Sequence, residues 1–172
     1  ALYQIYCREV NPQIRRGIFF PAGVCLVSST IIIPPYAMLY GEGAEASVIY
    51  MSGEDSTLNP YVARTGDSLQ QTGVNIGNSG AITPQYVTVS NMGFAAADGT
   101  TSMLLLEDLS NGSFNNVSFA GPLTTTNLNT AVNNTSGVEF ASTVSLVTNT
   151  VTFDRCVFSG TRSESTRLNS SH

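Results

Sequence analysis

The chain has 172 residues, a formal net charge of −5 and 11% charged residues against 42% hydrophobic ones. This length allows one domain with a sizeable core, and few charges combined with many apolar residues argue against disorder. The net charge is negative and no basic cluster is larger than Arg15-Arg16, so the sequence lacks the basic residues that bind phosphate groups. We therefore expect no nucleic-acid binding.

Other function classes are disfavoured by the spacing of particular residues. The longest apolar stretch, residues 23–34, contains Ser and Thr and falls short of the ~20 residues of a membrane helix, so we expect no membrane insertion. The three cysteines lack the spacing of a disulfide framework or a zinc site, and Cys25 and Cys156 are expected to be small buried side chains. His172 is the single histidine, which leaves no partner for a catalytic triad or a His-based metal site. We therefore assign no cofactor and no metal.

The N-terminal residues 1–12 predict a short helix. Leu2, Ile5 and Tyr6 lie near helical spacing, and a helix here would cover the end of the structure that follows. From residue 13 onward the pattern changes to short apolar runs, "GIFFPAGVCLVSS", "TIIIPPYAMLYGEG" and "ASVIYMSG". Pro and Gly separate these runs, which predicts strands joined by bends.

A repeated signature follows in the second half of the chain. The segments "VSNMGF" (89–94), "FNNVSF" (114–119) and "FDRCVF" (153–158) share an apolar-x-x-apolar-x-Phe pattern. The first two begin 25 residues apart and the third begins 39 residues later, an excess explained by a polar insertion at residues 122–137. Each signature predicts a strand, a tight bend and a second strand, and "SMLLLED" and "GVEFAS" predict a further strand after the first two.

If successive repeats stack, Phe94, Phe119 and Phe158 fall in one column of parallel strands. The bend pairs Ser90-Asn91, Asn115-Asn116 and Asp154-Arg155 then form a second column, in which amide side chains can hydrogen-bond along the stack. The sequence therefore predicts an all-β fold, a single-stranded parallel β-helix over residues 13–160, with residues 161–172 as a polar tail or truncated coil.

A long polar excursion at residues 53–84 is predicted to project from the coils as a loop insertion. Loops held by a rigid scaffold often carry binding, and this segment combines an aromatic ring with hydrogen-bonding groups, as a sugar ring prefers. The candidate carbohydrate-binding residues are Tyr61, Arg64, Asp67 and Gln70, with Gln71 beside them. Subunit contact, or no direct role, remains an alternative for the same loop.

Three carboxylates are the weak candidates for catalysis, because glycoside hydrolysis uses a pair of carboxyl groups. Glu139 alternates with Val138 and Phe140 and should point outward, where it could share a face with Glu107 of the preceding coil. Asp108 follows Glu107 directly and should face another direction. The alternative is that all three are solvated polar side chains, and we assign no catalytic residue.

The opening strands carry a resemblance to a known family. "FPAG" (20–23), "LVSSTIIIP" (26–34) and "LYGEG" (39–43) resemble the N-terminal signature of the pectate-lyase-like right-handed parallel β-helix superfamily, as found in bacteriophage tailspikes and tail fibres. "NVSFAGP" and "NTVTFDRCVFSGT" are similar to middle coils of the same proteins. The polygalacturonase cluster of Asp and His and the calcium-binding Asp cluster of pectate lyases find no matching positions here.

This resemblance implies a structural and receptor-binding component of a virion tail, located in the virion or outside the cell. Its expected partners are bacterial surface polysaccharide and other virion tail proteins, and its expected assembly is a homotrimer. The same superfamily supplies an alternative, a polysaccharide lyase or glycoside hydrolase. The scarcity of acid and base candidates favours the binding protein over the enzyme.

Overall fold

The computed structural model describes residues 17–52, 61–67, 83–96, 101–121, 137–141 and 149–159. Within these ranges the regular secondary structure consists of 12 β-strands, and every strand pairing is parallel. The predicted all-β class is confirmed. The helix predicted at residues 1–12 and the tail at residues 161–172 lie outside the described residues. No helix in the described part of the chain has the length and apolar character needed to cross a membrane.

The strands stack in three columns. The first column consists of β1 (Gly17–Phe20), β4 (Met38–Gly41), the first half of β7 (Thr88–Ala96), the first half of β9 (Ser110–Ala120) and β11 (Asn149–Asp154). The second column consists of β2 (Gly23–Val27), β5 (Ser47–Met51), the second halves of β7 and β9, and β12 (Val157–Ser159). The third column is a separate sheet of β3 (Ile31–Ile33), β6 (Tyr61–Thr65), β8 (Ser102–Glu107) and β10 (Val138–Ala141).

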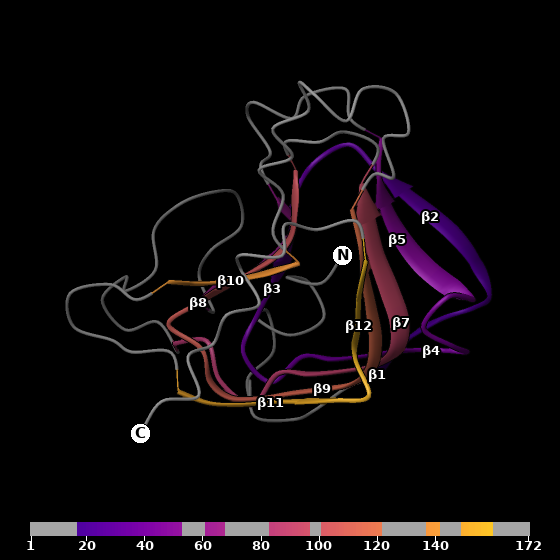
Figure 1. Ribbon diagram of the computed structural model, residues 1–172. Coiled ribbons are helices and arrows are strands. Elements are labelled where there is room, and N and C mark those ends of the chain that lie inside the picture. Colours follow the sequence, from indigo (N-terminus) through magenta and orange to yellow (C-terminus); the bar gives the residue numbers. More distant parts are fainter. Residues whose placement is uncertain are drawn as a thin grey trace.

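The chain visits the three columns in the same order on each pass. β1, β2 and β3 form the first pass, and β4, β5 and β6 pair with them in parallel to form the second. Figure 1 shows β2, β5 and β7 side by side at one side of the molecule, with β9 and β11 running together along another. Parallel neighbours need a long connection between them, and here the other two columns provide it. The predicted repeat is confirmed, because Val89 pairs with Phe114 and Phe114 with Phe153.

The interior contains the predicted phenylalanine column. Phe94 pairs with Phe119 and Phe119 with Phe158 in the strand register. The Phe94 and Phe119 ring centroids lie 5.8 Å apart with an interplanar angle of 9°, and those of Phe119 and Phe158 lie 5.0 Å apart at 16°. Phe114 and Phe153 form a second stack, with centroids 4.9 Å apart. Stacked rings add ~0.5–1.5 kcal/mol per pair to the free energy gained by burying them.

The predicted column of bend residues is also present. Asn91, Asn116 and Arg155 have φ values of 52°, 52° and 51°, the left-handed conformation that Asn tolerates better than most residues. The Asn116 Nδ2 donates to the Asn91 Oδ1 at 2.8 Å, and the Asn115 Nδ2 donates to the Asp154 Oδ2 at 2.6 Å. Each bend turns the chain from the first column into the second, so β7 and β9 each serve both.

Two sequence predictions are wrong in part. Residues 61–65 were predicted to lie in a loop insertion, but they form β6, which pairs with β3 on one side and β8 on the other. Cross-strand pairing overrides the polar local sequence here. Cys25 was predicted to be buried and is exposed. Cys25 lies on the inward row that continues through Ile49. Among the described residues, however, β2 pairs with β5 alone, so Cys25 has a strand neighbour on one side only. Cys156 is half-buried, and its Sγ lies 3.5 Å from the Phe114 carbonyl oxygen.

Candidate functional site

The outward face of the third column gathers several of the polar residues singled out above. Ala63 of β6 and Leu104 of β8 are fully buried in the core, and neighbouring residues on a strand point to opposite faces. Arg64, Leu105 and Glu139 therefore form an outward row across β6, β8 and β10, in which each is paired with the next. Glu107 lies two residues beyond Leu105 on the same face. Tyr61 and Ser102 begin β6 and β8 and join this row through hydrogen bonds to Glu139. We call the cluster of Tyr61, Arg64, Ser102, Glu107 and Glu139 the polar face.

One half of the polar face is an ion pair. The Arg64 Nη2 donates to the Glu107 Oε2, with 13% and 18% of the two side chains exposed. Beside it, the Thr65 Oγ1 donates to the Glu107 carbonyl oxygen and accepts from the Glu107 backbone N–H, both at 2.8 Å. These bonds fix the end of β8 to β6, so the Glu107 carboxylate is held by side-chain and backbone contacts together.

The other half is centred on Glu139. Its Oε2 accepts from the Tyr61 Oη at 2.9 Å, and its Oε1 accepts from the Ser102 Oγ at 2.7 Å. Tyr61 and Ser102 pair with each other at the beginnings of β6 and β8. Three successive strands thus contribute one side chain each to a single hydrogen-bonded group.

The environment of Tyr61 keeps its phenol protonated. Burial raises the pKa of Tyr61 to about 12 from 10.0, and the hydrogen bond to Glu139 and the charge of Glu139 act in the same direction. The phenol therefore remains a hydrogen-bond donor throughout the physiological pH range.

The remaining predicted site residues are placed elsewhere. Asp67 is fully buried and Asp108 is 3% exposed, so neither carboxylate contributes to an accessible surface in this conformation. Gln70 and Gln71 lie outside the described residues. Within the described part of the chain, no group of three His, Cys, Asp or Glu side chains is arranged to hold a metal ion.

Sequence reasoning chose Tyr61, Arg64, Glu107 and Glu139 but treated them as two unrelated sets. The structure brings the two sets into contact, Tyr61 with Glu139 and Arg64 with Glu107. Ser102 and Thr65 were missed, because a hydroxyl at the edge of an apolar run is common in a chain this rich in Ser and Thr. The signal that identifies Ser102 is its pairing with Tyr61, which requires the strand register.

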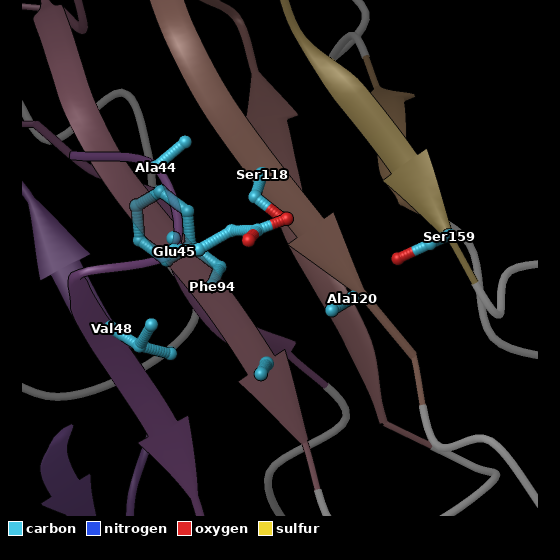
Figure 2. Close-up of a pocket in the computed structure, with 9 residues that line it drawn as sticks. Ala44, Glu45, Val48, Phe94, Ser118, Ala120 and Ser159 are labelled. Atoms are coloured by element: carbon cyan, nitrogen blue, oxygen red, sulfur yellow. The ribbon is translucent and has the colours of Figure 1, made fainter.

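A second surface feature lies on the outward face of the second column. Figure 2 shows a depression over β5, β7, β9 and β12, with Glu45 and Val48 on one side and Ser159 on the other. Its volume is about 260 Å³, and its floor is made by the small residues Gly93, Ala95, Ser118 and Ala120. A Cβ added at Gly93 would lie 2.6 Å from the Ala44 carbonyl oxygen, so glycine is needed where these segments meet.

Comparison with known proteins identifies no similar protein. No protein-family model matches the chain, and neither a curated protein nor a solved structure is significantly similar to it. The resemblance to the pectate-lyase-like superfamily therefore stays a prediction, and the function is argued from the geometry.

Proposed function

We propose that the three columns are the faces of a right-handed parallel β-helix. Three observations support this winding: the fixed order of columns on each pass, the uniformly parallel pairing, and the left-handed bend residue between the first and second columns. Connections between parallel strands are right-handed in almost all proteins, which supports the handedness. Each coil of such a solenoid buries its apolar side against its neighbours and leaves the outward side chains free for function.

We further propose that the chain is a virion structural and receptor-binding component that binds host surface polysaccharide through the polar face. The observation that carries this proposal is that β6, β8 and β10 hold Tyr61, Ser102 and Glu139 in one hydrogen-bonded group beside the Arg64–Glu107 pair. A saccharide offers hydroxyls that both donate and accept, and the polar face presents carboxylate acceptors, a phenol and a guanidinium. The aromatic ring of Tyr61 adds an apolar surface for a sugar ring.

Rigidity supports binding over turnover. Both carboxylates are already engaged by donors, Glu107 by Arg64 and Glu139 by Tyr61 and Ser102. A glycosidase needs one carboxyl group that carries a proton and delivers it to the leaving oxygen. Side chains that are fixed before the ligand arrives lose little freedom on binding, which favours affinity.

A polysaccharide lyase or glycoside hydrolase is the second candidate. Glu107 and Glu139 are brought to the same outward face by adjacent strands, which is the arrangement that a two-carboxylate mechanism needs.

The test measures binding and cleavage in the same samples. The full chain is passed over immobilised lipopolysaccharides and capsular polysaccharides from a panel of bacteria, and the size of each soluble polysaccharide is followed by size-exclusion chromatography. For a bound glycan, Glu139→Gln and Tyr61→Phe are expected to weaken affinity about five- to twentyfold, the effect of one or two hydrogen bonds. The matched controls are Glu42→Gln, on an exposed bend, and Tyr50→Phe, a half-buried tyrosine of the second column.

The outcomes separate the candidates. Binding without loss of chain length, weakened by the polar-face variants and not by the controls, supports the receptor-binding function. Shortening of a polysaccharide that Glu107→Gln or Glu139→Gln abolishes would establish the enzyme instead. Failure of the unaltered chain to bind any glycan of the panel contradicts both.

We also propose that the chain assembles as a homotrimer and contacts other virion tail proteins, as the family resemblance implies. Sedimentation velocity of the full chain over a hundredfold range of concentration tests the assembly. A mass of three chains supports the trimer, and a monomer throughout contradicts it.

A further inference from the structure

The outward face of the first column carries an exposed pair of aromatic rings. Phe19 of β1 and Tyr40 of β4 pair in the register, and 48% and 38% of these residues are exposed. Their ring centroids lie 5.4 Å apart with an interplanar angle of 44°. The two rings offer an exposed aromatic surface on which a ligand can stack.

A glycine makes room for this pair. A Cβ added at Gly17 would lie 2.6 Å from the Tyr40 Cε1, so the Tyr40 ring lies directly over the backbone of β1. The ring rests against the sheet because residue 17 has no side chain. The result is an aromatic surface close to the backbone at one end of the column.

The same row of residues becomes polar along the stack. Tyr40 pairs with Ser90, Ser90 with Asn115, and Asn115 with Asp154. A neighbouring outward row consists of Thr88, Ser113 and Thr152, each paired with the next. The aromatic pair on β1 and β4 is thus followed by polar groups on β7, β9 and β11, and the whole strip crosses five strands, a length of about 19 Å at ~4.8 Å per strand.

This strip carries almost no net charge. Among its described residues the charged ones are Asp154 and the adjacent Arg155, whose Nε lies 3.2 Å from the Asp154 Oδ2. Arg155 Nη2 also donates to the Asn115 Oδ1 at 3.0 Å, which orders the polar end. A ligand that matches the strip should therefore be neutral, and should combine apolar faces with many hydroxyls.

We propose that this first-column strip, from Phe19 and Tyr40 to Asp154, binds a neutral saccharide chain laid across the strands. A pyranose ring stacks its C–H face on the aromatic pair, and the following rings exchange hydrogen bonds with Ser90, Asn115 and Asp154. The strip belongs to a different column from the polar face and does not depend on the function proposed for it. Two binding surfaces on one chain would raise the avidity for a long polymer.

The polar rows argue against a protein partner as the occupant. The cores of protein interfaces are apolar, whereas here two rings are followed by rows of hydroxyl and amide groups. An ordered array of donors and acceptors fits a polyhydroxylated ligand better.

Affinity electrophoresis of the full chain in native gels tests the proposal. The gels contain hydroxyethyl cellulose, a neutral polymer of flat β-linked rings, or polygalacturonate as the anionic comparison. We expect the neutral polymer to retard the chain and the anionic one to have a much weaker effect. Phe19→Ala and Tyr40→Ala should each weaken the retardation about two- to tenfold, the effect of one aromatic contact.

Two variants make the test specific. Gly17→Ala keeps both rings but displaces that of Tyr40, so it should also weaken retardation. Leu26→Ala is the matched control, because it removes a 71% exposed apolar side chain of the second column. Circular dichroism of every variant confirms that the fold is retained. Tyr50→Phe, in β5 of the second column, should also leave retardation unchanged, because it lies outside the strip.

Absence of retardation by hydroxyethyl cellulose would overturn the proposal. Equal retardation of all variants would also overturn it, because binding would then lie elsewhere. A change of sedimenting mass in Tyr40→Ala, without a change in retardation, would show that the rings contact a second copy of the chain instead.

Discussion

Replacing Phe119 by alanine tests the stacking on which the fold depends. Phe119 is fully buried between Phe94 and Phe158, with centroid distances of 5.8 Å and 5.0 Å. A buried Phe→Ala change costs ~3–5 kcal/mol, and the loss of two stacked neighbours places this site toward the upper end of that range. We therefore expect the free energy of unfolding to fall by about 5 kcal/mol.

The matched comparison is Phe158→Ala at the end of the same column. Phe158 is 40% exposed and stacks on Phe119 from one side, so less apolar surface is lost and less of a cavity forms. We expect a loss of about 2 kcal/mol. Urea unfolding followed by circular dichroism gives both values from the midpoint and slope. Equal losses for the two variants, or a smaller loss for Phe119, would refute the column.

Three further changes test the polar face, the packing around Gly93 and the bend at Arg155. Tyr61→Phe should flatten the loss of stability at alkaline pH. Because the folded pKa of Tyr61 is raised to about 12, its contribution is complete below pH 10 and is lost as the pH rises toward 12. Allowing for partial exposure, the unaltered chain should lose about 1 kcal/mol more than the variant between pH 9 and pH 11, and equal urea midpoint shifts would contradict this. Gly93→Ala places a Cβ 2.6 Å from a backbone oxygen and should lower the free energy of unfolding by ~1–3 kcal/mol. Gly43→Ala, whose Cβ would have its nearest atom at 3.4 Å, should lower it by less than half as much. Similar thermal midpoints for the two variants would disprove the crowding at Gly93. Arg155→Asn should extend the amide column above Asn116 and exceed Arg155→Ala in stability by about 1 kcal/mol, and an Asn variant no more stable than the Ala variant in urea would disprove the ladder.

Much of the fold could be predicted because large aromatic residues mark the repeat. Phe94, Phe119 and Phe158 recur at matching points of a strand-bend-strand signature, and alternation along a strand fixes which side chains point inward. β6 was not predicted because its sequence carries no comparable pattern of large apolar residues. Its residues Tyr61–Thr65 contain no long apolar run, and they are ordered by strands on both sides that local sequence does not reveal.

For the polar face, the sequence predicted the side of the strands correctly but not the register. The sequence placed Glu139 near Glu107, but in the register Glu139 pairs with Leu105 and Glu107 with Ala141. An error of two residues preserves the face of a strand, so the prediction that the two carboxylates share a side agrees with the structure. The same error changes every contact, and for this reason the partners Tyr61 and Ser102 could not be foreseen.

The bends between the third and first columns show why some repeats cannot be recognised from residue types. Tyr36, Tyr86, Asn111 and Thr150 occupy equivalent positions with φ values of 63°, 54°, 57° and 52°, although tyrosine, asparagine and threonine differ in size and chemistry. A left-handed residue other than glycine costs ~1–2 kcal/mol, so other interactions must stabilise this conformation. Backbone hydrogen bonds are one of them, since the Tyr36 N–H donates to the Gln85 carbonyl oxygen and the Tyr86 N–H donates to the Ser110 carbonyl oxygen. The Tyr36 and Tyr86 rings also stack, with centroids 5.6 Å apart. Contacts between neighbouring segments thus impose the same conformation on residues of different type, and this repeat is recognised from the strand register and not from the residue type.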